Sequence, residues 1–102
     1  MSQMWLYWPI KVIALAKVVI VFKIFPEGLE IDLNKLKKRI QSSLPTNTSI
    51  YKFEEEPIAF GLVAIIAYVI LPEEGGKMDL VEDSIRAVNG VSEIETIMVR
   101  RV

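Results

Sequence analysis

The chain has 102 residues, 52% of them hydrophobic and 25% charged, a length that supports one hydrophobic core and therefore one domain. Its 12 basic and 13 acidic side chains give a net charge of −1, which excludes a bulk electrostatic attraction to nucleic acid or to an anionic membrane. The absence of cysteine and histidine excludes disulfides, thiolate metal sites and the usual nucleophile–base pairs. The absence of cysteine also fits the reducing cytosol, so a cytoplasmic location is expected.

Residues 1–16 differ in composition from the rest and are interpreted as an N-terminal extension to a domain at residues 17–102. The extension is rich in large apolar side chains, namely Met4, Trp5, Leu6, Tyr7, Trp8 and Ile10. A signal peptide is disfavoured because no basic side chain precedes the apolar part, and a transmembrane helix is disfavoured because it would contain Pro9, Lys11 and Lys17.

Several interpretations of this extension stay open. The first is a disordered or loosely packed tail, and the second is an extra strand. The third is translated sequence from an over-extended gene start, in which case the codon of Leu15 would be the true, non-AUG start codon. Attachment to a membrane through Trp5 to Leu15 is a further alternative, since an aromatic and apolar segment of this kind can lie in a lipid interface.

The first strand is predicted from Lys17 to Ile24, where apolar residues alternate with others. Its second face is also partly apolar, which is typical of a strand in the middle of a sheet. Asp32 is expected to cap a helix whose apolar residues recur at spacings of three and four, at Leu33, Leu36, Ile40 and Leu44. The basic side chains of this helix are interpreted as a solvated surface.

The second strand, from Ile50 to Glu56, is polar and is expected at a sheet edge, whereas the apolar run from Leu62 to Leu71 is expected in the middle. A second helix is predicted from the apolar residues Met78, Val81, Ile85 and Val88, and it is expected to end at Asn89-Gly90. A fourth strand closes the chain from Val91 to Val102, with apolar surface from Ile94, Ile97, Met98 and Val99.

The order of these elements predicts an α+β fold of the ferredoxin-like, split βαβ type (βαββαβ). In this fold a four-stranded antiparallel sheet carries two helices on one face. Its first and third strands lie in the middle of the sheet, and in this chain those are the two most apolar strands. Local pattern and topology therefore agree.

A connecting loop follows the glutamates at 54–56, and its residues combine a turn proline with an aromatic and a glycine. Pro57 fixes its own φ and Gly61 permits a close approach of the backbone, so Phe60 is expected near the tip. Two interpretations of Phe60 stay open at this point: it faces a partner, or it folds back into the core.

Other chemistry is disfavoured by residue placement. Adjacent glutamates on a strand point to opposite faces, so the three glutamates do not converge on a metal ion. Glu73-Glu74-Gly75-Gly76 lacks the lysine and spacing of a phosphate-binding loop, and the third strand lacks the aromatic and basic residues that stack RNA bases. Arg100 and Arg101 are expected to face opposite ways at the end of an edge strand.

Four segments resemble archaeal elongation factor 1-beta: Pro57–Leu62 after the glutamates, Val18–Ile24 followed by a proline, the loop at Glu74-Gly75-Gly76, and the turn Val88–Val91. The resemblance spans about Lys17 to Val102. It implies the same split βαβ fold and a role in exchanging GDP for GTP on the GTPase elongation factor 1-alpha. No cofactor, no metal and no direct contact with nucleic acid or membrane are expected.

The resemblance also implies a partner-binding site, because related eukaryotic domains contact the GTPase through a Pro-x-x-Phe-Gly loop and a C-terminal basic residue. Phe60 matches the loop residue and Arg101 the terminal one, although eukaryotic members carry lysine there. The expected partner-binding residues are Pro57, Ile58, Phe60, Gly61, Arg100 and Arg101. The alternative function is a small-molecule-binding regulatory module on the same fold.

Overall fold

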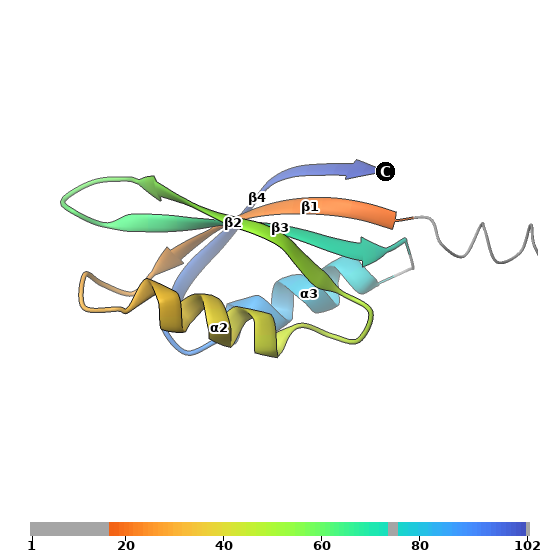
Figure 1. Ribbon diagram of the computed structural model, residues 1–102, viewed down its shortest axis with the longest axis horizontal. Coiled ribbons are helices and arrows are strands. Elements are labelled where there is room, and N and C mark those ends of the chain that lie inside the picture. Colours follow the sequence, from red (N-terminus) through yellow and green to blue (C-terminus); the bar gives the residue numbers. More distant parts are fainter. Residues whose placement is uncertain (1–16, 74–75, 102) are drawn as a thin grey trace, which may run out of the picture.

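The computed structural model describes residues 17–73 and 76–101, so the predicted N-terminal extension lies outside the described residues. The elements follow one another as β1 (Lys17–Pro26), α2 (Leu33–Ser43), β2 (Ser49–Pro57), β3 (Val63–Pro72), α3 (Lys77–Arg86) and β4 (Val91–Arg101). This βαββαβ order confirms the predicted α+β, ferredoxin-like fold. Both helices lie on the same side of the sheet (Figure 1).

The four strands form one antiparallel sheet in the order β2-β3-β1-β4. The two apolar strands, β3 and β1, therefore lie in the middle, and the two more polar strands lie at the edges, as the sequence predicts. This arrangement is favourable because central strands have neighbours on both sides, while charged edge strands resist pairing with other chains.

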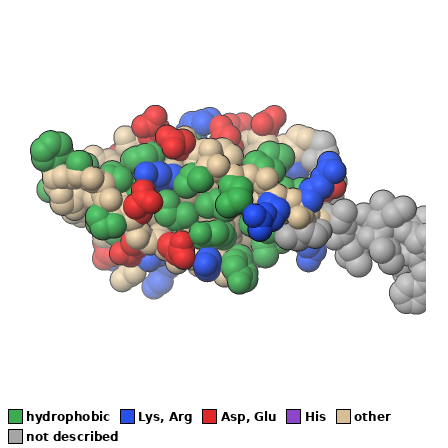
Figure 2. Space-filling view, turned by 90° about the horizontal axis from the view of Figure 1, so that it is seen from above, with side chains coloured by type: hydrophobic (Ala, Val, Ile, Leu, Met, Phe, Trp, Pro, Cys, Tyr) green, Lys and Arg blue, Asp and Glu red, His purple; other side chains and the backbone are tan. Residues whose placement is uncertain are grey.

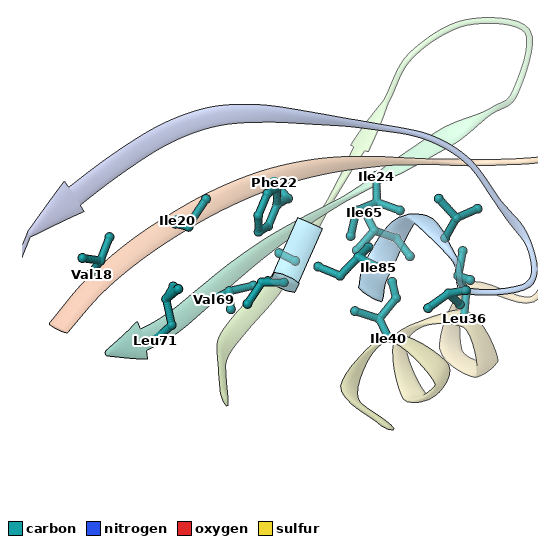
Figure 3. Packing of buried hydrophobic residues seen from close by; sticks show 14 residues of the cluster. Val18, Ile20, Phe22, Ile24, Leu36, Ile40, Ile65, Val69, Leu71 and Ile85 are labelled. Atoms are coloured by element: carbon teal, nitrogen blue, oxygen red, sulfur yellow. The ribbon is translucent and has the colours of Figure 1, made fainter. Parts of the chain in front are cut away.

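The core lies between the sheet and the two helices. Figure 3 shows side chains from β1 and β3 pointing toward side chains from both helices. The largest fully buried side chains are Phe22, Ile20, Ile24, Leu36, Ile40, Ile65, Leu71, Ile85, Val69 and Val81. Burial of each contributes about 1.5–3 kcal/mol to folding relative to exposure, so this layer supplies the main driving force.

Helix α2 begins where the sequence predicts. The Asp32 carboxylate accepts hydrogen bonds from the backbone N–H groups of Asn34 at 2.9 Å and Lys35 at 3.3 Å. These bonds satisfy donors that the first helical turn leaves unpaired. Leu36 and Ile40 are buried, and the polar side of the helix faces outward.

Two predictions about helix α3 are wrong. Helix α3 ends at Arg86, before Asn89-Gly90, because the chain must turn there to enter β4: Gly90 has a φ of 104°, and its carbonyl accepts a hydrogen bond from the Glu27 N–H at 2.9 Å. Met78, which the sequence analysis assigns to the apolar side of this helix, is exposed instead. Ile97, Met98 and Val99, predicted to supply apolar surface on β4, are exposed as well. The three in β4 lie on an edge strand that has a neighbouring strand on one side only.

Candidate partner-binding site

A tight turn joins β2 to β3 at one end of the sheet. The Leu62 N–H donates to the Ala59 carbonyl at 2.9 Å, and the Ile58 N–H donates to the Leu62 carbonyl at the same distance. The two central residues, Phe60 and Gly61, both have positive φ, at 53° and 82°. Positive φ at both central positions is the mark of a mirror-image hairpin turn, whose twist matches that of the flanking strands.

Phe60 lies at the tip of this turn and is 94% exposed. The structure thus selects the outward-facing interpretation of this side chain over the one in which it packs in the core. A bulky residue with positive φ is uncommon, and the left-handed region costs such a residue about 1–2 kcal/mol. The turn therefore holds an aromatic ring in water at a conformational cost.

The other three predicted residues of this loop, Pro57, Ile58 and Gly61, lie on either side of Phe60 in the chain. Pro57 is the last residue of β2 and pairs with Val63, so its missing N–H falls at the end of an edge strand. Ile58 is half-buried. Gly61 lies so close to Leu29 that an added Cβ would be 3.3 Å from the Leu29 Cδ2 atom.

Leu29 is a second exposed apolar residue at this end, and the sequence analysis missed it. It lies between β1 and α2 and is 66% exposed, beside the Phe60 turn. An apolar residue between Gly28 and Glu30 in a connecting segment is the signal that could have identified it. Phe60 and Leu29 together form what we call the loop end of the sheet.

Arg101 lies at the opposite end of the sheet. It pairs with Val18 in β1, which pairs in turn with Leu71 in β3. From Val63, beside the turn, to Leu71 is a span of roughly 26 Å along β3 at 3.3 Å per residue. Figure 1 shows the β2–β3 turn and the C-terminus at opposite ends of the molecule.

The Arg101 guanidinium forms an ion pair with the Glu73 carboxylate, and its side chain is 79% exposed. Arg100 is opposite Val19 in the strand register and lies beside Met98 on the other face of the sheet. The prediction that the two arginines face opposite ways is confirmed. The six predicted site residues consequently fall into two separate groups, the loop end and what we call the arginine end.

The three glutamates of β2 diverge as expected, and each has its own lysine partner. Glu54 pairs with Lys52 at 3.2 Å, Glu55 with Lys37 at 2.8 Å, and Glu56 with Lys23 at 2.5 Å. The three lysines belong to three different elements, β2, α2 and β1. The arrangement is therefore a set of surface ion pairs between strands and helix, each of modest stabilising effect.

A small polar network occupies the open face of the sheet beside these pairs. The Tyr68 hydroxyl donates to Glu54 Oε1 at 3.0 Å. Hydrogen bonds from Lys52 and then from Tyr68 lower the pKa of Glu54, and the same bonds to Glu54 raise the pKa of Lys52 and of Tyr68. Charge-assisted bonds of this kind favour the ionised carboxylate and the protonated partners.

Within residues 17–73 and 76–101, neither helix combines the length and the hydropathy that a membrane span requires. The membrane-attachment alternative concerns Trp5 to Leu15, which lie outside the described residues.

Comparison with known proteins gives a consistent result. Residues 19–102 match the family described as the EF-1 guanine nucleotide exchange domain. The chain is similar to elongation factor 1-beta of Methanothermobacter thermautotrophicus, with 44% identity over 85 residues that cover 83% of this chain and 96% of the relative. It is also similar to elongation factor 1-beta of Staphylothermus marinus, with 40% identity over 89 residues that cover 86% and 99%.

Among solved structures, the chain is similar to the C-terminal domain of the MgtC protein from Mycobacterium tuberculosis. The TM-score is 0.53 at 12% sequence identity, and the match covers 80% of this chain and 86% of the other. At this identity the likeness concerns the fold alone.

Proposed function

The chain belongs to the elongation factor 1-beta family, whose members promote exchange of GDP for GTP on elongation factor 1-alpha, and we propose that it contacts this GTPase with both ends of its sheet. The observation that carries the proposal is the exposed Phe60 on a hydrogen-bonded turn. The family match favours exchange over the alternative of a small-molecule-binding regulatory module.

The loop end supplies an apolar anchor. Phe60 and Leu29 are both exposed, and Leu29 lies against Gly61, the residue that follows Phe60, so this end of the sheet presents apolar surface that costs free energy in water. Binding hot spots are enriched in aromatic side chains that fill pockets on the partner. Because the turn already holds Phe60 outward, little conformational entropy is lost when a pocket of the GTPase receives it.

The arginine end supplies a cation. An exposed ion pair such as Arg101–Glu73 is worth about 0.2–1 kcal/mol, so Arg101 can leave Glu73 at small cost when a stronger field is available. A guanidinium brought to the nucleotide site of a GTPase would compete with the magnesium ion for the same negative groups. Arginine is bulkier than lysine and planar, so it would make a broader contact there.

Exchange then follows from linkage and needs no covalent step. If the domain binds the nucleotide-free GTPase more tightly than the GDP-bound form, GDP must bind the complex more weakly by the same factor. The chain thereby acts as an exchange factor without a cofactor or metal of its own. We place it in the cytoplasm with its GTPase partner, and no direct contact with nucleic acid or membrane forms part of this proposal.

The proposal is tested by measuring release of a fluorescent GDP analogue from elongation factor 1-alpha. Phe60→Ala and a variant lacking Arg101 and Val102 are each expected to slow the stimulated release, and Leu29→Ala is expected to slow it less than Phe60→Ala. Leu80→Ala is the matched control for Phe60→Ala, because Leu80 is an exposed apolar residue on α3 and is not part of the β2–β3 turn. Unchanged release with both the Phe60 variant and the shortened variant would refute the proposed site.

A further inference from the structure

An apolar groove lies on the open face of the sheet, between the two ends. It has a volume of about 350 Å³ and is lined by Val19, Val21, Tyr51, Tyr68, Ile70, Met98 and Arg100. Figure 2 shows hydrophobic side chains gathered in the middle of this face, with charged side chains around them. This volume lies within the range of ligand-binding clefts.

All four strands contribute to the groove. Val19 is opposite Ile70 and Arg100 in the strand register, and Val21 is opposite Tyr68 and Met98. Tyr51 packs edge-on against Tyr68, with ring centroids 6.4 Å apart and an interplanar angle of 73°. The floor of the groove is thus a continuous apolar strip across the sheet.

The groove has no cover among residues 17–73 and 76–101, because both described helices lie on the other face (Figure 1). Tyr51 and Met98 are exposed at its two edges. Antiparallel sheets often have one solvated face, but that face is normally polar. An apolar strip at this position indicates that another group binds over it.

We propose that the chain's own residues 1–16 occupy this groove. The segment enters β1 at Lys17, two residues before Val19, so it begins next to the groove it would cover. Sixteen residues can span up to roughly 50 Å when extended, which is ample length to reverse direction and run back across the sheet. Tethering also gives the segment a high effective concentration at the groove.

The composition of the segment suits an apolar strip. It contains two tryptophans, a tyrosine and several aliphatic residues, and Lys11 is its one charged side chain. Each aromatic residue can bury about 150–250 Å². The Arg100 guanidinium at the rim can stack on an aromatic ring, an interaction that an aliphatic side chain could not make. Because the family match begins at residue 19, this cover is a feature of the chain beyond the shared domain.

Tryptophan fluorescence tests the proposal directly, because the chain has two tryptophans and both, Trp5 and Trp8, lie in the segment. In the native full-length chain we expect emission that is blue-shifted relative to the urea-unfolded chain and protected from acrylamide quenching. Met98→Glu, which places a charge at an exposed edge of the groove, is expected to move both measurements to the values of the unfolded chain. Tyr51→Glu at the other edge is a second variant, and circular dichroism checks that each stays folded.

Leu80→Glu is the matched control, since it adds the same charge at an exposed apolar position on the helix side and should leave the emission native. A chain restricted to residues 17–102, which contains all six elements and the whole core, should bind an apolar dye more strongly than the full-length chain. Native emission equal to that of the unfolded chain, or insensitive to both groove variants, would overturn the proposal. So would a blue shift that requires high protein concentration, which identifies a second copy, or added phosphatidylcholine vesicles, which identifies lipid.

Discussion

The loop end presents an apolar side chain, Phe60, on a strained and hydrogen-bonded turn, whereas the arginine end presents a charged side chain, Arg101, that is paired with Glu73. The proposed contact at Phe60 is held in place before a partner arrives. The one at Arg101 must be released from an internal ion pair first. The difference suggests that the loop end contributes mainly to binding, through desolvation, and the arginine end mainly to the change in nucleotide affinity, through charge.

The largest expected effect comes from removing both contacts together. Phe60→Ala is expected to raise the activation free energy of stimulated GDP release by about 2 kcal/mol, and Arg101→Ala is expected to raise it by about 1 kcal/mol. The double variant should therefore release GDP more slowly by roughly 100-fold. Because the two sites lie far apart, the two effects should add. A double-mutant cycle on GDP release measures this, and a large coupling energy would contradict the picture of two independent ends.

Gly61→Ala is expected to disturb the loop end alone. An alanine at a φ of 82° costs about 1–2 kcal/mol, and its Cβ would also press on Leu29. Urea unfolding should show this loss of stability. Gly28→Ala is the matched control in the neighbouring loop, because an added Cβ there meets the flexible end of the Glu30 side chain, and a loss as large as that of Gly61→Ala would argue against strain at the turn.

Glu73→Gln is expected to change the arginine end alone. It frees Arg101 from its ion pair, so stimulated GDP release should become faster by at most about fivefold, equivalent to the 0.2–1 kcal/mol of an exposed pair. The gain should shrink at high salt. Glu82→Gln, which removes a partner of Arg86 on α3, provides the control; slower release with Glu73→Gln would mean that the ion pair positions Arg101 productively.

The smallest effect is expected midway between the ends, at Tyr68. The lowered pKa of Glu54 means that its ionised form contributes stability above the ordinary value of 4.5, which is lost as the pH falls through the lowered pKa. Tyr68→Phe removes one of the two bonds responsible, so the acid-induced loss of stability should be smaller in this variant. Urea midpoints between pH 2 and 7, with Tyr51→Phe as control, measure the change. GDP release at neutral pH should be unaffected; a slower release would extend the site to the middle of the sheet.

The sequence by itself determined the element order, the strand positions in the sheet and the start of α2. Alternating apolar residues, the Asp32 cap and the charge on β2 are local signals, and each reports directly on burial or on an unpaired backbone group. The residues of the proposed site were also selected one by one, because a proline, an aromatic and a glycine in succession predict a turn and the resemblance singled out Phe60 and Arg101.

The tertiary structure decided what these residues do together. It turned Phe60 outward, placed Leu29 against Gly61, paired Arg101 with Glu73 and separated the two ends by the length of the sheet. It also ended α3 at Arg86 and left the apolar residues of β4 exposed, since both depend on where β1 and its neighbours lie. Distances between residues far apart in the sequence depend on strand register and helix packing, and no local pattern encodes them.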